Sequence, residues 1–406
     1  MITTAHRSLL VLAALAALVT GLLAAPGAAQ AAPLLPSADP FYRAPADLAA
    51  AKAGDVLRTR TVSIGYQDNR LPARATQVLY RTSDQFGAPA ATVTTILTPS
   101  NPAPGRPMIS YHAFYDALGS QCDPSYTLRG GPDSSVPDLA AAGGFTAAGY
   151  TVVVPDYEGQ KMRWTLGRES GYAALDGIRA AQHALKAPSS TKVGMFGYSG
   201  GSVPTMFGAD LAAKYAPELH LVGAAAGGVF VNPATDLPYV NGSKEWAGVI
   251  PALMSVYDKA YGLNLDAYYS PKGKRIIKEV QGGCINSFAS AYPGLTDRQM
   301  LAGGRSILDV PGAREALADN VAGTQGTPRI PMFIGQGLSD GKGDGIMNHQ
   351  DAVSLASSYC RRGVPTRMDT YRGVSHTGAA VPFAADASAF LADRFAGRAP
   401  GGCSIR

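Results

Sequence analysis

Strands that are apolar on both faces alternate with helices through the middle of this chain. Residues 151–155 are nearly pure valine, as expected for a strand buried on both faces. A helical pattern over 170–187, a strand over 192–196, a helix over 201–215 and a strand-like stretch over 220–229 follow in turn. This alternation predicts an α/β fold with a mostly parallel central sheet flanked by helices on both faces.

The alternation is interrupted once and then resumes. Earlier strands are predicted over 55–66, 75–99 and 108–114, and later ones over 330–337 and 366–374, with helices over 348–362 and 384–396. Between 231 and 325 the chain carries Pro, Gly, Tyr and helical fragments but no clear buried strand. We therefore predict an α/β core built from residues 32–230 and 326–406, with a helical cap inserted over 231–325.

The first 31 residues have the pattern of a secretory signal peptide. Arg7 supplies the positive charge, an apolar stretch covers 9–25, and Ala29 and Ala31 form an A-x-A cleavage pattern. A membrane anchor is the alternative, but the stretch is alanine-rich and the cleavage pattern and Pro33 follow at once. We expect cleavage near Ala31, a secreted extracellular protein, and no integral membrane segment after processing.

Charge and cysteine usage exclude several classes of protein. Charged residues make up 16% of the 406 residues and the net charge is +5, with no basic run beyond 272–278, so we expect no nucleic-acid partner. Without a Cys-x-x-Cys motif or a Cys/His cluster, we expect no metal and no cofactor. An even number of cysteines in an exported chain predicts two disulfides among Cys122, Cys284, Cys360 and Cys403, and spacing alone leaves three pairings open.

A serine motif follows one of the predicted buried strands. Gly197, Tyr198, Ser199, Gly200 and Gly201 match G-x-S-x-G, with an apolar strand leading in and a helix leading out. This context is typical of a nucleophile elbow, a tight strand-to-helix turn that exposes the serine hydroxyl at the end of the sheet. Small residues at 197 and 201 permit close strand–helix packing, and the helix N-terminus favours a developing anion. The sequence thus predicts Ser199 as a nucleophile and the Gly200 amide as one oxyanion donor.

A serine nucleophile of this kind needs a base, and the base must follow an acid along the chain in α/β-hydrolases. Three histidines come after the motif. His220 begins a core strand and precedes any plausible acid, while His349 lies on a predicted helix face. His376 lies in what reads as a loop after the strand over 366–374, and we predict it to be the base.

The acid should follow the strand over 330–337. Asp340 comes three residues after that strand and is the predicted acid, with Asp344 as the second choice. A calcium loop formed with Asp351 is the competing interpretation, but the spacing matches no known ligand pattern and no glutamate closes it. For the second oxyanion donor, the stretch 110–116 lacks an HGGG motif, and His112 within it reads as a loop or packing histidine.

These motifs together resemble the secretory lipase family known from Candida, which has many actinobacterial members. The resemblance runs over nearly the whole mature chain and rests on DPFY at 39–42, GDVLR at 54–58, residues 110–116, CDPSY at 122–126, VPDYEG at 154–159, DGIRA at 176–180, the serine motif and YAPEL at 215–219. It implies an α/β-hydrolase fold with a helical lid and a Ser199–Asp340–His376 triad. It also implies the backbone amide of Asp116 as the second oxyanion donor, and Cys122–Cys284 and Cys360–Cys403 disulfides. Residues 202–204 and the aromatic stretch 112–115 depart from the expected pattern.

The leading functional hypothesis is a lipase or carboxylesterase that hydrolyses acyl esters of the triacylglycerol type, with a lipid or small-molecule ester as its partner. A secreted acyltransferase or peptidase with the same triad is one alternative, and a catalytically dead binding protein on the same scaffold is another. We expect the cap as a whole to cover the Ser199 cleft in water, to form the acyl pocket and to open during transient contact with a lipid surface. Trp246, Met254 and Tyr257 are bulky members of the predicted cap and should contribute to this pocket, the alternative being that they only pack the cap onto the core.

Overall fold

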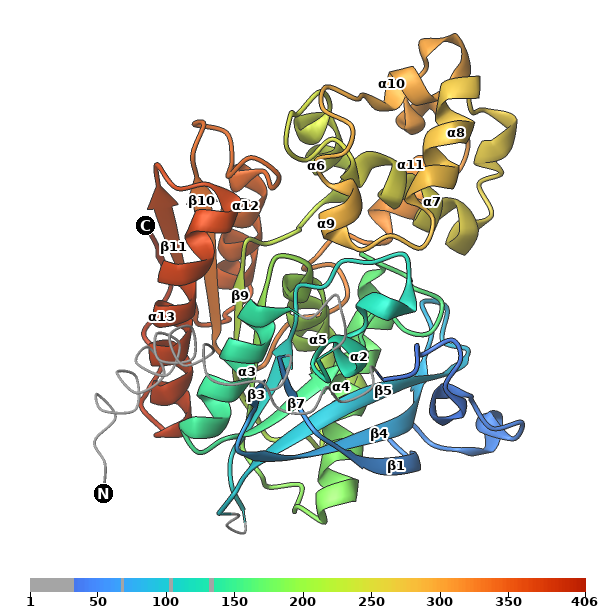
Figure 1. The fold of residues 1–406 in the computed structure, drawn as a ribbon. Helices are drawn as coiled ribbons and strands as arrows, with labels where there is room; N and C mark the ends of the chain where they lie inside the picture. The colour runs from blue at the N-terminus through green and yellow to red at the C-terminus, as the bar shows by residue number, and fades with distance from the viewer. Residues whose placement is uncertain (1–32, 67–68, 102–104, 131–134) are drawn as a thin grey trace.

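The computed structural model describes residues 33–66, 69–101, 105–130 and 135–406 (Figure 1). The predicted signal peptide therefore lies outside the described residues. Within them, none of the helices is both long enough and apolar enough to cross a membrane. The same residues contain no group of three or more His, Cys, Asp or Glu side chains that could hold a metal ion.

A ten-stranded sheet forms the centre of the described part of the molecule. Its spatial order is β1 (Val56–Val62), β4 (Ala73–Ser83), β5 (Pro89–Pro99), β7 (Thr151–Pro155), β6 (Met108–His112), β8 (Val193–Tyr198), β9 (Leu221–Gly227), β10 (Met332–Leu338), β11 (Thr366–Arg372) and β12 (Ser404–Ile405). The pairs from β1 to β7 are antiparallel, and every pair from β7 to β12 is parallel. A separate hairpin pairs β2 (Gly65–Tyr66) with β3 (Asn69–Arg70). The predicted mostly parallel sheet is confirmed.

Helices cover both faces of this sheet. Alternate residues of a strand point to opposite faces, so an apolar strand needs packing partners on both sides. In β7, Val153 belongs to the hydrophobic cluster on the face of the sheet that is covered by helices α4 (Gly167–Leu185), α5 (Ser202–Tyr215) and α12 (His349–Arg361). Val152 and Val154 belong instead to the cluster on the opposite face, which is covered by α3 (Val136–Ala147) and α13 (His376–Phe395). Both faces of the valine-rich strand are therefore buried, as the sequence predicts. The remaining short elements of the core are η2 (Pro40–Tyr42), η3 (Leu48–Ala50), η4 (Ser120–Cys122), α2 (Pro124–Thr127) and η5 (Ser199–Gly201).

A group of helices between β9 and β10 forms a body of its own beyond one end of the sheet (Figure 1). We call residues 228–331 the helical insert. It contains α6 (Pro233–Val240), α7 (Val249–Tyr261), η6 (Leu265–Ala267), α8 (Pro271–Val280), α9 (Ile285–Phe288), α10 (Asp297–Met300), η7 (Ala302–Gly304), η8 (Ile307–Asp309) and α11 (Ala313–Ala318). Leu253, Met254, Ile276, Met300 and Leu317 belong to its own hydrophobic cluster. Its helices all lie within the interval 231–325 for which the sequence predicts a cap.

The last long helix begins earlier than the sequence predicts. The expected helix covers 384–396, whereas α13 begins at His376 with Ser375 as its N-cap, whose side chain accepts a hydrogen bond from the Gly378 amide. Glycine and an internal proline, Pro382, lower the helix propensity of the first two turns, so the pattern there reads as a loop. The prediction that His376 lies in a loop is wrong: it is the first residue of a helix.

Candidate active site

The serine motif forms a sharp turn between β8 and the helix α5. Ser199 adopts a left-handed backbone conformation with φ of 55°, which is strained for a residue with a side chain. A Cβ atom at Gly197 would overlap the carbonyl oxygen of Gly201, and one at Gly200 would overlap the carboxyl group of Asp116. The glycines of the motif are therefore required by how closely the strand, the helix and the neighbouring loop approach one another.

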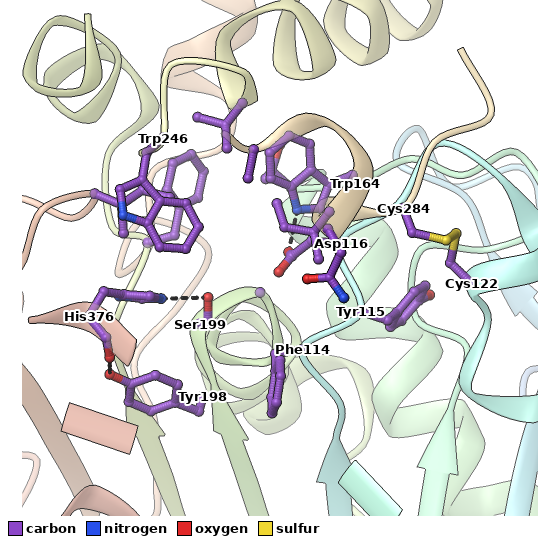
Figure 2. Close-up of a pocket in the computed structure, with 18 of the residues that line it drawn as sticks. Phe114, Tyr115, Asp116, Cys122, Trp164, Tyr198, Ser199, Trp246, Cys284 and His376 are labelled. Atoms are coloured by element: carbon purple, nitrogen blue, oxygen red, sulfur yellow. Dashed lines mark hydrogen bonds between the residues drawn. A yellow bond between two sulfur atoms is a disulfide. The ribbon is translucent and has the colours of Figure 1, made fainter. Parts of the chain in front are cut away.

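The structure brings Ser199 and His376 together at this turn. Ser199 Oγ lies 2.7 Å from Nε2 of His376 (Figure 2). Nδ1 of the same ring lies 2.7 Å from Oδ2 of Asp344. The backbone amide of His376 also donates to the Asp344 carbonyl at 2.8 Å, and the Tyr198 hydroxyl donates to the His376 carbonyl. The imidazole is thus held from both sides, with one nitrogen facing the serine and the other a carboxylate.

The carboxylate of Asp344 is fully buried, and both of its oxygens accept hydrogen bonds. Oδ1 accepts from the amides of Ile346 and Met347, at 3.1 and 2.8 Å. Oδ2, which faces His376, also accepts from Nε2 of Gln336 at 2.9 Å. These donors stabilise the negative charge and fix the plane of the carboxylate.

Asp340, the acid predicted from the sequence, does not contact His376, and this prediction needs correction. Its Oδ1 accepts from the amides of Lys342 and Gly343, both at 2.8 Å, and its Oδ2 accepts from the hydroxyl of Tyr239 at 2.8 Å. It therefore closes an exposed turn, a role that aspartate side chains commonly play two residues before the bonded amide. The second choice, Asp344, occupies the position beside the imidazole.

Three other histidines lie away from the Ser199 hydroxyl and form their contacts elsewhere. Nε2 of His349 lies 3.0 Å from the hydroxyl of Thr370, and His220 is exposed. His112 is buried at the end of β6, where burial lowers its pKa to about 3 and its ring nitrogens contact Ser110 and Thr205. It is therefore a neutral packing histidine, as the sequence suggests.

The loop after β6 places Asp116 against the serine turn. Asp116 has a left-handed φ of 38°, and its carboxyl group accepts a hydrogen bond from the indole Nε1 of Trp164 (Figure 2). Burial raises the pKa of this carboxyl to about 6. Asp116 and Gly200, the two predicted oxyanion donors, are thus neighbours in the structure. We refer to residues 113–118 as the oxyanion loop.

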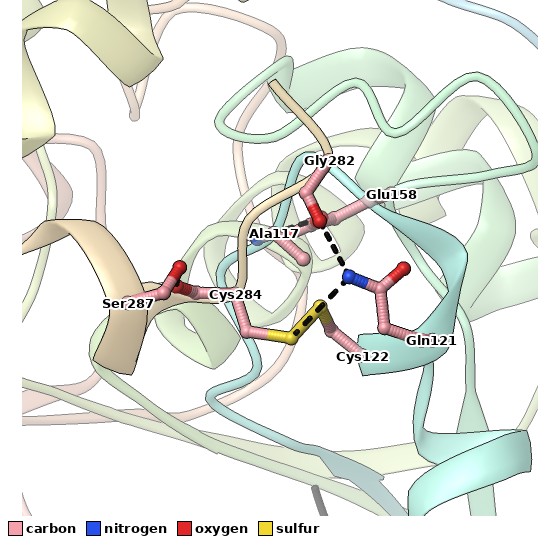
Figure 3. The surroundings of a disulfide bond; sticks show 7 residues. All are labelled: Ala117, Gln121, Cys122, Glu158, Gly282, Cys284 and Ser287. Atoms are coloured by element: carbon pink, nitrogen blue, oxygen red, sulfur yellow. Dashed lines mark hydrogen bonds between the residues drawn. A yellow bond between two sulfur atoms is a disulfide. The ribbon is translucent and has the colours of Figure 1, made fainter. Parts of the chain in front are cut away.

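Both disulfides that the family resemblance implies are present. Cys122 pairs with Cys284 and joins the chain just after the oxyanion loop to the helical insert (Figure 3). Cys360 pairs with Cys403 and joins α12 to the segment leading into β12. Both predicted pairings are confirmed, and no cysteine of the described residues is free.

A cavity of about 1200 Å³ opens above Ser199 and His376. Apolar residues of both the core and the helical insert line it: Phe114, Val203, Phe230, Leu237, Val240, Trp246, Val249 and Leu253. The Trp246 ring stands edge-on to the His376 ring, with centroids 5.7 Å apart (Figure 2). Met254 and Tyr257 do not line the cavity but lie in the core of the insert, so of the three cap residues singled out in the sequence, Trp246 alone meets this expectation.

Comparisons with known proteins agree with this fold. The model of a family described as secretory lipase matches residues 138–402. Lipase 5 of Candida albicans is 32% identical over 388 residues, covering 90% of this chain and 82% of that protein. A Mycobacterium tuberculosis protein named as a probable inactive lipase is 33% identical and covers 90% of this chain and 84% of its own length. A crystal structure of Candida antarctica lipase A superposes with a TM-score of 0.84 at 29% identity, over 92% of this chain and 90% of that one.

Proposed function

Because the chain belongs to the secretory lipase family, we propose that it is a secreted serine hydrolase that cleaves acyl esters of the triacylglycerol type with Ser199 as the nucleophile. The observation that carries this proposal is the unbroken series of hydrogen bonds from Ser199 Oγ through His376 to Asp344, at 2.7 Å for each step. A serine hydroxyl is a weak nucleophile on its own and needs such a base and orienting acid.

Each side chain of this series has a defined role in the proposed reaction. Ser199 Oγ attacks the ester carbonyl carbon while His376 Nε2 takes the hydroxyl proton, and Asp344 stabilises the imidazolium that forms. The amides of Gly200 and Asp116 hydrogen-bond the oxyanion. Collapse of the tetrahedral intermediate expels the alcohol, which takes the proton from Nε2 and leaves an acyl group on Ser199. Water then attacks this acyl-enzyme, with His376 again acting first as base and then as acid.

The shape and lining of the cavity support an acyl substrate. Its walls are mostly apolar, and Ser199, His376 and Asp116 line it together. The transfer of an acyl chain from water to such a lining lowers the free energy, while the ester carbonyl stays beside Ser199. Because the helical insert contributes Trp246 and neighbouring walls, we infer that it acts as a lid that a lipid surface displaces.

Export is part of the same proposal. The signal-peptide pattern at residues 1–31, the secretory family and the two disulfides support cleavage near Ala31 and an extracellular location. Sequencing the N-terminus of the protein recovered from culture medium tests it. A chain that begins at Met1, or one found only inside cells, would contradict it.

The name of the Mycobacterium tuberculosis relative raises the alternative of a binding protein without catalytic activity. In this chain the hydrogen-bonded Ser199, His376 and Asp344 favour an active enzyme. The decisive test is labelling with a fluorophosphonate probe, followed by hydrolysis of p-nitrophenyl esters from short to long acyl chains. We expect labelling and turnover in the wild type and neither in Ser199→Ala, with kcat lowered by about 10⁴-fold or more. An unlabelled wild type would favour the binding protein.

A further inference from the structure

Glu158 is a fully buried carboxyl group that the proposed reaction does not use. It follows β7 and lies behind the oxyanion loop (Figure 3). Its two oxygens accept from one donor, the amide of Ala117, at 3.3 and 3.2 Å. Among the described residues, no basic side chain forms an ion pair with it. Burying a carboxyl group without a cation costs free energy, and one hydrogen bond from a backbone amide offsets only a small part of that cost.

The amide that Glu158 binds lies next to Asp116 in the oxyanion loop. Ala117 directly follows Asp116, whose left-handed φ of 38° must be maintained by its surroundings. The backbone amide of Glu158 donates to the hydroxyl of Tyr115 at 2.8 Å, on the other side of Asp116. Glu158 therefore contacts the residue before and the residue after Asp116, once through its backbone and once through its side chain.

The remainder of the oxyanion loop is anchored by other groups. The hydroxyl of Tyr157 donates to the carbonyl of Ala113 at 2.6 Å, and the amide of Leu118 donates to the carbonyl of Gly283 at 2.8 Å. The Cys122–Cys284 disulfide secures the same junction with the helical insert. Removing the Glu158 side chain should consequently leave the course of the loop intact and free only the peptide next to Asp116.

We propose that Glu158 is a positioning residue of the oxyanion hole: its carboxyl group holds the Ala117 amide and thereby keeps Asp116 in the backbone conformation that directs its own amide at the substrate oxyanion. This inference rests on the proposed function of Asp116 and extends it to a residue that does not touch substrate. The surroundings of Glu158 fit a neutral acceptor, because burial and the nearby Asp116 and Asp123 raise its pKa well above the usual range. A neutral carboxyl still accepts through its carbonyl oxygen.

The test compares an ester with its thionoester, in which sulfur replaces the carbonyl oxygen and accepts hydrogen bonds weakly. A working oxyanion hole favours the ester, so the ratio of the two kcat/KM values reports on its donors independently of overall activity. Glu158→Ala should lower kcat on the ester by about 10- to 100-fold, less than the roughly 10²–10³-fold loss for complete removal of a donor, with KM nearly unchanged. The ester-to-thionoester ratio should fall by about tenfold.

Two further variants keep the inference falsifiable. Glu158→Gln retains one carbonyl acceptor and should recover part of the ratio, and it serves if the alanine variant fails to fold. Glu169→Gln is the matched control, because Glu169 is also buried and accepts a backbone amide, that of Gln85 at 3.0 Å, but pairs with Arg163 away from the oxyanion loop. It should lower the melting temperature while leaving the ratio within about twofold.

Each result is decisive. A reduced ratio in the Glu158 variants but not in Glu169→Gln supports the positioning role. An unchanged ratio in Glu158→Ala and Glu158→Gln, with activity falling only as the melting temperature falls, overturns it while leaving the ester hydrolase proposal in place. A wild type that hydrolyses neither ester would instead refute the proposed function itself.

Discussion

Replacing Asp344 by asparagine should reverse the hydrogen bond that orients the catalytic imidazole. The two backbone amides of Ile346 and Met347 both point at Oδ1, so the asparagine oxygen must stay there. The NH₂ group is then forced into the position of Oδ2, facing His376 Nδ1. Gln336 cannot turn to compensate, because its Oε1 accepts from the Val229 amide at 2.8 Å.

The consequence for catalysis follows from the tautomer. An NH₂ group that donates to Nδ1 leaves the proton of a neutral imidazole on Nε2, which then cannot accept the proton of Ser199. In a serine protease the equivalent change lowers kcat by about 10⁴-fold, which corresponds to about 5.5 kcal/mol of transition-state stabilisation. We expect a loss of this size in Asp344→Asn on a soluble short-chain ester. The melting temperature should fall moderately, because the NH₂ group also faces the Nε2 donor of Gln336 in the buried site, while the side chain keeps its volume and its backbone contacts.

Asp340→Asn is the isosteric control in the same loop. Its exposed side chain can keep its oxygen on the amides of Lys342 and Gly343 and donate to the Tyr239 hydroxyl, so activity should stay within about twofold. Both variants are compared by kcat on p-nitrophenyl butyrate. A severe loss in Asp340→Asn with a mild effect in Asp344→Asn would refute the assignment of the acid.

Four further outcomes are expected. His349→Ala should leave kcat within about twofold, because this residue contacts neither the serine nor its base; a loss matching that of the nucleophile variant would reopen the choice of histidine. Trp246→Ala should shift acyl chain-length preference more than it lowers the melting temperature, whereas equal losses on short and long esters would assign the ring to packing alone. Asp116→Asn should be more stable to urea than the wild type at pH 8, by up to about 3 kcal/mol of unfolding free energy. The folded-state pKa of the Asp116 carboxyl is raised to about 6, so its contribution to stability is complete below the ordinary pKa of 3.8 and is lost as pH rises through 6. The difference between the two proteins should therefore vanish near pH 4, and a difference independent of pH would contradict this. Non-reducing peptide mapping should recover the Cys122–Cys284 pair, and changing both residues to serine should cost about 2–5 kcal/mol of unfolding free energy; free thiols in the exported protein would count against the structure.

The sheet and the tight turn at Ser199 could be predicted from the sequence because their signals are local. Two buried faces require a continuous apolar strand such as Thr151–Pro155, and a tight strand-to-helix turn requires glycine around Ser199. Each requirement is met within a few neighbouring residues. The position of His376 beside Ser199 was also predictable, because the order of the three groups along the chain leaves few candidates for the proposed base.

The acid could not be chosen in the same way. Asp340 and Asp344 lie in one glycine-rich loop, and either can follow β10. Which of them faces the imidazole depends on the path of the backbone, in which Asp340 closes the turn and Asp344 is carried inward to Gln336. The Asp-Gly pair at 340–341 is itself a turn signal and was the available hint that the first aspartate serves the backbone.

The contacts around the oxyanion loop could not be predicted from sequence patterns either. Glu158 and Trp164 are far from Asp116 along the chain, and nothing in their spacing links them to it. They meet because β6 and β7 are neighbours in the sheet and the segments that follow both strands turn toward the same cavity. Such convergence is a property of the tertiary structure rather than of any local motif.

The central claim is that an acyl group passes through Ser199, and trapping that intermediate tests it most directly. The protein is mixed with excess p-nitrophenyl butyrate, quenched in acid within the first turnover, and analysed by intact mass and peptide mapping. The account predicts a mass increase of one butyryl group on the peptide that contains Ser199, absent from Ser199→Ala. Continued hydrolysis with no acyl group on this peptide, or with the group on another residue, would contradict it.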